Sequence, residues 1–384
     1  MGYKRLLFYG AFLLLYGLIN FFIALRGGQA LSGSYPRLAW AWGIFVLLVS
    51  LLFPVSRWLS HLLPHEISRA LIMVASYWLG AMYYLFVIIL ALDLVRLADR
   101  FINLLPANLK TPHPGVAAVL FGILLVLFVY GTWNACHPRI IHYDLSIAKK
   151  SSPLDKLRIV MVSDIHLGWI VGTNRLNAMV DSINPLQPDL VLLVGDIVDE
   201  GADLEAEEEI PRAFKRIKSR YGTFAVPGNH EYISGQVYRV GKFLQDAGVT
   251  VLRDRYIKVD DGFYLVGRDD LNRGGFSQNR RKDLRELLQG LDSELLPVIL
   301  MDHQPFKLEE ADRTGVDLQF SGHTHLGQFF PNNLITHKLY ERDWGYLRKD
   351  HLQAIISCGY GTWGPPIRIG NRPEIVVADV VFNK

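Results

Sequence analysis

Five short strings in the second half of the chain carry side chains that bind metals and transfer protons. They are Asp164-Ile165-His166, Gly195-Asp196-Ile197-Val198-Asp199, Gly228-Asn229-His230-Glu231, Asp302-His303 and Gly322-His323-Thr324-His325. Together they supply two aspartates, one asparagine and four histidines of ligand type, with His230 left for proton transfer. Mixed imidazole and carboxylate sets suit Mn, Fe or Zn rather than Ca or Mg. Two such ions about 3.5 to 4 Å apart form a clamp for in-line displacement at phosphorus, so the sequence predicts two divalent metal ions and a phosphorylated substrate.

The chemistry of individual residues explains why this set suits two ions. Asp164 and His166 alternate with Ile165, so in an extended segment both side chains point to the same face and can hold one ion. Asp196 has two carboxylate oxygens and can bridge two ions. A single histidine is more often a hydrogen-bonded structural residue, and Asp-x-His or Gly-Asp alone is weak evidence. The ordered set of five strings is what argues against a purely structural role.

Short apolar runs alternate with helix-like stretches around these strings. The runs of strand length are 157–162, 189–194, 222–226 and 297–301. The helix-like stretches are 174–183, 204–218, 236–247 and 282–291. Alternation of this kind predicts a layered α/β domain. Because each string begins where an apolar run ends, and ligands bind at the carboxyl ends of strands in open α/β sheets, we expect the strings to converge.

The first part of the chain has a different composition. Half of all residues are hydrophobic, and the long uncharged runs are concentrated before residue 137. Each of these runs is long enough to cross a hydrocarbon core about 30 Å thick as a helix. They are 6–25, 38–56, 70–92 and 114–133. The sequence therefore predicts a membrane domain over 1–137 with four transmembrane helices, followed by a catalytic domain over 138–384.

A signal peptide is the alternative interpretation of the first run, because Lys4 and Arg5 precede it. Its apolar stretch is longer than that of most signal peptides, which is about 7 to 15 residues. Cleavage after Ala30 would still leave three spans. The chain is thus expected to be an integral membrane protein under either interpretation.

Four spans place the N-terminus and the catalytic domain on the same side of the membrane. That side has seven basic residues near the spans, namely Lys4, Arg5, Arg57, Arg69, Arg139, Lys149 and Lys150. The opposite side has five, namely Arg26, Arg37, Arg96, Arg100 and Lys110. The positive-inside rule therefore favours a multi-pass protein with a cytoplasmic catalytic domain. Cys136 and Cys358 do not decide the compartment.

The order of the five strings resembles that of a known superfamily. The series Asp-x-His, Gly-Asp-x-x-Asp, Gly-Asn-His-Glu, His and Gly-His-x-His is similar to the calcineurin-like metallophosphoesterases, over roughly Arg158 to Asp379. The stretches 163–168 (Ser-Asp-Ile-His-Leu-Gly) and 361–366 (Gly-Thr-Trp-Gly-Pro-Pro) look like its membrane-anchored group, the transmembrane proteins with a metallophosphoesterase domain. The resemblance does not extend to the four spans. It implies an α/β fold, a four-layer α/β/β/α sandwich of two mixed sheets, preceded by the four-helix transmembrane region.

The resemblance also implies a role for each residue of the set. One ion would be held by Asp164, His166, Asp196 and His325. The other would be held by Asp196, Asn229, His303 and His323. In the mechanism that it implies, a hydroxide bridging the two ions attacks phosphorus, His230 protonates the leaving oxygen, and Asp199 orients that imidazole. A positioned histidine typically contributes about 10²- to 10⁴-fold as a general acid.

Three functional classes fit these observations. The first is a membrane-anchored phosphoesterase or pyrophosphatase that acts on a lipid-linked substrate, for which a UDP-diacylglucosamine pyrophosphatase is one candidate. The second is a phosphoprotein or nucleotide phosphoesterase that the spans merely tether. The third is a non-enzymatic membrane sensor with a metal-binding domain. The complete ligand set favours an enzyme, and we expect a phosphorylated small molecule or lipid as its substrate.

Two further inferences concern partners. A formal net charge of +3 and the lack of an extended basic, aromatic-rich pattern argue against a nucleic-acid partner. Arg368, just after Pro365-Pro366, is the best candidate for a contact to a substrate phosphate. The sequence makes no prediction of the oligomeric state.

Overall fold

The chain divides into two compact units in a computed structural model that describes residues 2–60, 62–148, 152–199, 208–274 and 280–383. Unit 1 comprises Met1–Thr132 and Gly364–Ile367, and unit 2 comprises Trp133–Trp363 and Arg368–Lys384. Three parts of the predictions, namely Lys149, Lys150 and residues 204–207, lie outside the described residues.

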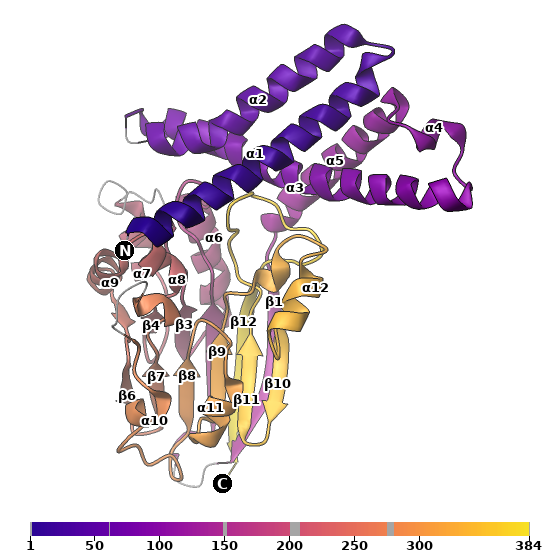
Figure 1. The fold of residues 1–384 in the computed structure, drawn as a ribbon. Coiled ribbons are helices and arrows are strands. Elements are labelled where there is room, and N and C mark those ends of the chain that lie inside the picture. The colour runs from indigo at the N-terminus through magenta and orange to yellow at the C-terminus, as the bar shows by residue number, and fades with distance from the viewer. Residues whose placement is uncertain (1, 61, 149–151, 200–207, 275–279, 384) are drawn as a thin grey trace. The chain divides into compact units, whose positions relative to one another are not determined.

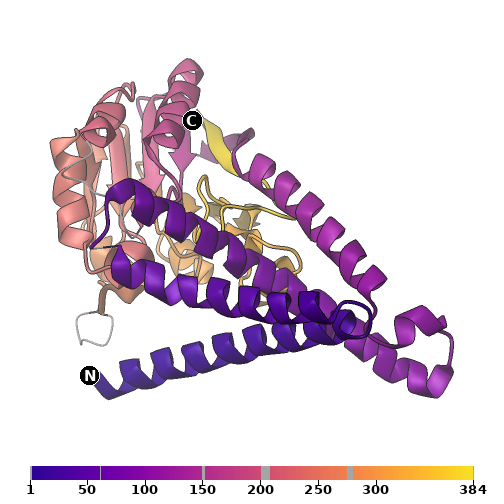
Figure 2. The same cartoon turned by 90° about the horizontal axis from the view of Figure 1, so that it is seen from above.

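Long apolar helices form unit 1 (Figure 1). They are α1 (Gly2–Ser32), α2 (Pro36–Leu59), α3 (His65–Ile102) and α5 (Pro114–Ala135), with the short α4 (Ala107–Lys110) between the last two. In the described part of the chain, four helices are long and apolar enough to cross a membrane, one over each predicted run (Figure 2). α3 continues beyond the predicted end at residue 92 and stops where Asn103 adopts a left-handed φ of 56°.

A small buried cluster holds α1, α2 and α3 together. Its members are Tyr16, Ile23, Val46, Val49, Trp78 and Met82. Asn20 lies within it, accepts a hydrogen bond from Trp78 Nε1 over 2.9 Å and donates one to the carbonyl oxygen of Tyr16 over 2.9 Å. Large side chains elsewhere on these helices, such as Leu14, Leu48 and Phe121, are exposed. An apolar surface of this kind marks a membrane or partner surface.

Two mixed sheets form the centre of unit 2, and among the described residues each has six strands. The first has the order β1 (Arg139–Ala148), β12 (Glu374–Asn383), β2 (Lys156–Val162), β3 (Leu190–Val194), β4 (Thr223–Val226), β5 (Val249–Val251). The second has the order β10 (Gly345–Lys349), β11 (Leu352–Ile356), β9 (Leu318–Ser321), β8 (Val298–Met301), β7 (Phe263–Gly267), β6 (Arg255–Val259). The antiparallel neighbours are β12 with β2, β10 with β11, and β6 with β7.

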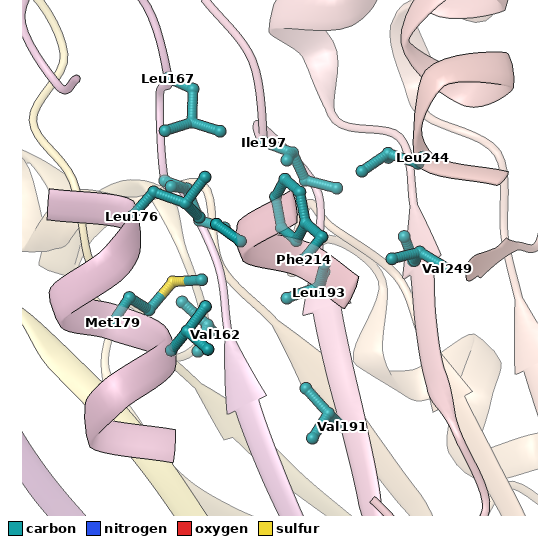
Figure 3. Packing of buried hydrophobic residues seen from close by; sticks show 14 of the residues in the cluster. Val162, Leu167, Leu176, Met179, Val191, Leu193, Ile197, Phe214, Leu244 and Val249 are labelled. Atoms are coloured by element: carbon teal, nitrogen blue, oxygen red, sulfur yellow. The ribbon is translucent and has the colours of Figure 1, made fainter. Parts of the chain in front are cut away.

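Helices cover the outer face of each sheet. On the first sheet, α6 (Thr173–Ile183), α7 (Glu209–Lys215) and α9 (Val237–Asp246) share a core with β2 and β3, which includes Leu176, Met179 and Val191 (Figure 3). On the second sheet, α10 (Leu284–Leu287) and α11 (Leu308–Arg313) contribute Leu284 and Leu308 to another core.

A further core fills the space between the two sheets. Ile159 and Leu192 from the first sheet are buried against Phe263 and Phe320 from the second. Successive side chains of a strand point to opposite faces, so Val191 faces the helices while Leu192 faces the other sheet. Unit 2 is therefore a four-layer α/β/β/α sandwich, as predicted.

Local sequence accounts for the predicted strands and for the ends of α10. All four predicted strands are present, as β2, β3, β4 and β8. α10 is shorter than the predicted helix over 282–291. Asp283 caps its start by accepting a hydrogen bond from the backbone nitrogen of Arg285 over 2.9 Å, and Gly290 turns the chain after its end with φ at 87°.

Candidate metal centre

Each of the five strings follows the carboxyl end of a strand. The strands are β2, β3 and β4 in the first sheet and β8 and β9 in the second. β2, β3 and β4 are parallel neighbours, as are β8 and β9. Their carboxyl ends therefore lie together, and the structure gathers the predicted site residues there, as strand order led us to expect.

A first group of ligand-type side chains consists of Asp164, His166 and His325. One atom from each lies within 4.8 Å of the others. His325 Nε2 is 3.3 Å from Asp164 Oδ1 and 3.1 Å from His166 Nε2, and all three residues are buried. Two imidazole nitrogens and a carboxylate oxygen at this spacing can share one divalent cation.

A second group consists of Asp196, His303 and His323, again with one atom from each within 4.8 Å of the others. Asp196 Oδ2 lies 3.2 Å from His303 Nε2 and 3.9 Å from His166 Nε2 of the first group. Asn229, the first residue of α8 (Asn229–Ile233), is buried. Oδ2 of Asp196 therefore stands between the two groups, where it can serve both cations, while Oδ1 accepts a hydrogen bond from the backbone nitrogen of His230 over 2.9 Å.

Buried polar atoms at this edge need a positively charged partner. Within the described residues, Asn229 Oδ1 and His303 Nε2 are buried without a hydrogen-bond partner. His303 donates from Nδ1 to the carbonyl oxygen of Val194 over 2.8 Å, so its Nε2 is directed to the site, next to Asp196. Burial lowers the pKa of His303, but Asp196 outweighs burial and raises that pKa well above its usual range, so in the metal-free chain Nε2 carries a proton whose place a bound cation would take. The residues present therefore fit bound divalent metals.

The protonation states of Asp196 and His323 also suit metal ligands. Burial raises the pKa of Asp196, but the nearby His303 and His166 outweigh burial and hold that pKa well below its usual range. Burial lowers the pKa of His323 to about 3, and the positive charge of His303 adds to the effect. Asp196 is therefore ionised and His323 neutral near pH 7, as metal binding requires.

The backbone of the ligand-type residues adopts a conformation that residues other than glycine seldom have. φ is positive at Asp164 (53°), His166 (53°), Asp196 (50°), His323 (71°) and His325 (48°). Each residue in such a conformation lowers the stability of the fold by about 1 to 3 kcal/mol, and residues of this kind cluster at functional sites. The expectation of an extended Asp164–His166 segment is therefore wrong, because the chain turns at both residues after leaving β2.

Glycines in the strings allow these side chains to approach the backbone closely. A Cβ atom at Gly228 would overlap the carboxylate of Asp196, and one at Gly322 would overlap that of Asp164. In the absence of that Cβ, the backbone nitrogen of His323 donates to Asp164 Oδ1 over 3.0 Å. These two glycines are thus needed to position the carboxylate of another string.

A histidine–carboxylate pair lies beside the first group. His230 Nδ1 is 3.1 Å from Asp199 Oδ1, and Asp199 Oδ2 is 3.6 Å from His166 Nδ1. Burial lowers the pKa of His230, but Asp199 and Asp196 outweigh it and raise that pKa to about 9. Because Nδ1 faces a carboxylate, Nε2 is the nitrogen that can give a proton to another group. The exposed indole ring of Trp363 lies 6.1 Å from the imidazole ring of His230.

Glu231 has a positioning role that the sequence did not reveal. Its buried carboxylate accepts hydrogen bonds from the backbone nitrogens of Ile197 (2.7 Å), Val198 (2.9 Å) and Gly228 (2.7 Å). These bonds join the loop that carries Asp196 to the start of α8. The only hint in the sequence is that Glu231 follows His230 directly.

Arg368 does not have the predicted contact to substrate. Its side chain is fully buried and donates to the carbonyl oxygens of Gly359 (3.1 Å) and Gly361 (2.7 Å). One guanidinium nitrogen also lies 3.3 Å from His325 Nδ1. The prediction of an open phosphate contact is wrong, because the guanidinium group is used to hold the loop behind His325.

Known proteins match a large part of this chain. Residues 157–327 match the family model of the calcineurin-like phosphoesterases. A transmembrane protein with metallophosphoesterase domain from Danio rerio is 33% identical over 264 residues, which are 66% of this chain and 60% of that protein. The Bos taurus protein of the same description is 32% identical over 292 residues, 72% of this chain and 65% of that protein.

A bacterial relative is matched over almost its whole length. An uncharacterized metallophosphoesterase from Aquifex aeolicus is 29% identical over 260 residues, which are 67% of this chain and 97% of that protein. By contrast, the present chain spans less than two thirds of the length of the two vertebrate proteins. Together with the four-layer sandwich and the gathered ligand-type residues, these matches show that residues 157–327 are similar to the calcineurin-like phosphoesterases.

Proposed function

We propose that this chain is a membrane-anchored hydrolase of phosphoester or pyrophosphate bonds that uses two divalent cations, Mn, Fe or Zn. In this proposal, 138–384 form the catalytic domain and 1–137 the membrane domain. The observation that carries it is the position of Asp196 Oδ2, which lies 3.2 Å from His303 Nε2 in one group of ligand-type side chains and 3.9 Å from His166 Nε2 in the other, with the His230–Asp199 pair beside them.

Seven side chains would hold the two cations. For one cation the ligands would be Asp164, His166, Asp196 and His325. For the other they would be Asp196, Asn229, His303 and His323. When bound, such cations lower the pKa of water toward neutrality and neutralise phosphoryl oxygens.

His230 would donate the proton that the leaving oxygen needs. Asp199 accepts the hydrogen bond from Nδ1, which fixes the ring and stabilises its charged form. The remaining nitrogen, Nε2, would then act as the general acid. Asp199 would act only through His230, as an orienting carboxylate.

A lipid-linked substrate fits the membrane domain best. Helices that hold the active site near the bilayer restrict its search for such a substrate to two dimensions. We therefore propose four membrane crossings, a cytoplasmic catalytic domain and a phosphorylated or pyrophosphorylated lipid as substrate, with UDP-diacylglucosamine as one candidate. A nucleotide or phosphoprotein substrate, or a sensor without activity, would be the alternative outcomes.

A substrate screen on the full chain tests this proposal. The protein, purified in detergent and loaded in turn with Mn, Fe or Zn, is offered phosphatidic acid, UDP-diacylglucosamine, nucleotides, a phosphopeptide and soluble nitrophenyl esters. We expect metal-dependent release of product, fastest from the lipids. Cleavage of the soluble compounds alone would disprove the lipid proposal, and a protein that binds two metals but cleaves nothing would be a sensor.

A further inference from the structure

The helix α12 (Asn333–Leu339) in unit 2 has its apolar side chains on the outside. Leu334, Ile335 and Leu339 are 55%, 57% and 65% exposed, and Phe330, one turn before Leu334, is 53% exposed. These four residues are called the α12 apolar face. None of the seven residues of α12, all of which the structure describes, is buried. A surface helix of a soluble domain normally places its apolar side chains against the core.

The polar side of α12 is the one that faces the protein. Thr336 Oγ1 donates to Asp343 Oδ2 over 2.6 Å, and His337 Nδ1 lies 2.8 Å from Asp343 Oδ1. Asp343 is buried, and its carbonyl oxygen accepts a hydrogen bond from Thr324 Oγ1 over 2.6 Å. Thr324 separates two of the candidate metal ligands in the string 322–325. Polar bonds therefore fix α12 to the metal-binding loop, and its apolar side remains for another partner.

The α12 apolar face lies close to the candidate metal centre. The ring of Tyr340, the residue that follows α12, is 6.3 Å from that of His323 and 4.9 Å from that of Phe306. Residues 326–329 connect the last candidate metal-binding string, 322–325, to Phe330. A partner that covers the α12 apolar face would therefore lie close to the candidate metal centre.

The end of a membrane-crossing helix is joined to the same region within unit 2. Asn134, in the last turn of α5, donates from Nδ2 to the carbonyl oxygens of Arg368 (3.0 Å) and Asn371 (2.6 Å). The segment between them is bonded to the α12 apolar face, because the backbone nitrogen of Phe330 donates to the carbonyl oxygen of Ile369 over 2.7 Å. Figure 1 shows α12 and the start of β1, which follows α5, at the same end of the two sheets.

The residues around this region are those that favour a membrane–water interface. Trp133 is exposed at the end of α5, with the guanidinium carbon of Arg372 6.0 Å from its ring. Lys338 and Arg342 are exposed beside Leu339 and can contact anionic headgroups. Exposed tryptophan, basic side chains and a compact apolar helix face are typical of segments that lie in the interface.

We infer that the α12 apolar face enters the interfacial region of the lipid bilayer and brings the candidate metal centre to the level of the headgroups. Its partner is thus a lipid surface. The consequence for catalysis rests on the proposed function: a phosphate group attached to a lipid reaches the metals without leaving the membrane. Insertion itself does not depend on activity, so the two can be tested separately.

Fluorescence quenching by brominated lipids tests insertion. Cys358 is buried and Cys136 is exposed, so Cys136→Ser provides a background for a single exposed label. Bimane is attached to Ile335→Cys in the full chain and, as a matched control, to Leu295→Cys, an exposed position just before β8 and so at the amino end of the second sheet. In proteoliposomes of brominated phosphatidylcholine, we expect strong quenching at 335 and little at 295.

Equal, weak quenching at both positions would overturn the inference. A second copy of the chain that covers this face would shield residue 335 from bromine and give disulfide-linked dimers of Ile335→Cys before labelling, and either result would also overturn it. Strong quenching at 335 without such dimers supports a lipid surface as the partner.

Activity in vesicles tests the consequence for the substrate. Leu334→Glu combined with Leu339→Glu is compared with Leu295→Glu, using phosphatidic acid in phosphatidylcholine vesicles and the soluble probe p-nitrophenyl phosphate. We expect the double variant to lose about tenfold or more of its turnover on the lipid and to keep its turnover on the soluble ester, since two apolar anchors are replaced by charges. The control should keep both activities.

The other outcomes separate the inference from the proposed function. Equal loss on both substrates in the double variant would mean that the face is structural, and would overturn the inference. If the unaltered protein cleaves neither compound, the proposed function fails, while the quenching at residue 335 still decides whether the face enters the membrane.

Discussion

Unit 1 and unit 2 differ in whether their apolar side chains are exposed or buried. In unit 2, residues such as Ile159, Phe263 and Phe320 are completely buried between the two sheets. In unit 1, Leu14 and Leu48 are exposed on the outer sides of their helices. Unit 2 thus encloses its own apolar core, whereas unit 1 needs an apolar solvent around it, and a lipid bilayer supplies one.

Polar side chains show the same division. Unit 1 buries Asn20 with its hydrogen bonds satisfied, as a local contact between helices. Unit 2 collects ionisable groups such as Asp196 and His303 at the ends of its strands, where some of their atoms have no hydrogen-bond partner among the described residues. The sandwich can hold the strained backbone of these residues because its layers are closely packed. Within unit 2, α12 resembles the helices of unit 1, because it exposes its three large apolar residues Leu334, Ile335 and Leu339.

The largest loss of activity is expected for a substitution among the charged candidate ligands of unit 2. Asp196→Asn keeps the shape of the side chain but removes the negative charge that stands between the two ligand groups. We expect activity to fall to background and bound metal to fall below two ions per chain, measured by elemental analysis. Asp144→Asn, at an exposed position on β1, is the matched control and should change neither value. Two retained ions in Asp196→Asn would contradict the bridging role.

A smaller loss is expected when the proton donor is removed and the metals stay. His230→Ala should retain two ions and lose about 10²- to 10⁴-fold in turnover, because a positioned general acid contributes by that factor. The loss should be least for an ester with an acidic leaving group, which needs no proton. Unchanged turnover on a poor leaving group would rule out the acid role.

The contrast in packing between the two units predicts unequal costs for removing a large side chain. Ile159→Ala leaves a cavity between the sheets and should destabilise unit 2 by about 2 to 5 kcal/mol. Leu14→Ala on the outer side of α1 should cost far less, because lipid or detergent fills the space. Thermal unfolding of the full chain in detergent, followed for each variant, measures the difference. Similar losses of stability would show that Leu14 is packed against protein.

Sequence patterns predicted the parts of the fold that depend on burial. The β-branched runs at 157–162 and 189–194 form β2 and β3 because strands buried on both faces are apolar throughout. The convergence of the candidate site residues was predicted for a related reason. Each string follows such a run, and parallel strands bring their carboxyl ends to the same edge.

The parts that could not be predicted depend on contacts between distant segments. Nothing local marks Asp164 as left-handed, with φ at 53°, since its carboxylate accepts a hydrogen bond from the backbone nitrogen of His323 in a distant string. Arg368 looked available to substrate because the sequence does not show that the carbonyl oxygens of Gly359 and Gly361 surround it. The spacing of apolar residues such as Ile335 in the short helix α12 likewise does not tell which side of the helix faces the protein.

The smallest effect is a dependence of stability on pH in the metal-free protein. The pKa of His230 is raised to about 9 in the folded chain, against about 6.5 when unfolded, because Asp199 and Asp196 outweigh burial. Because the pKa of His230 is higher in the folded chain, its protonation stabilises the folded state. This stabilisation is complete below pH 6.5 and is lost as the pH rises through 9. After chelation, the unaltered protein should therefore melt at a higher temperature than His230→Ala at pH 6, and the gap should narrow by pH 10. A gap that is constant with pH would mean that His230 stabilises unit 2 by packing alone. Restoring the metals should reduce the gap at pH 6, because two nearby cations oppose the protonated imidazole.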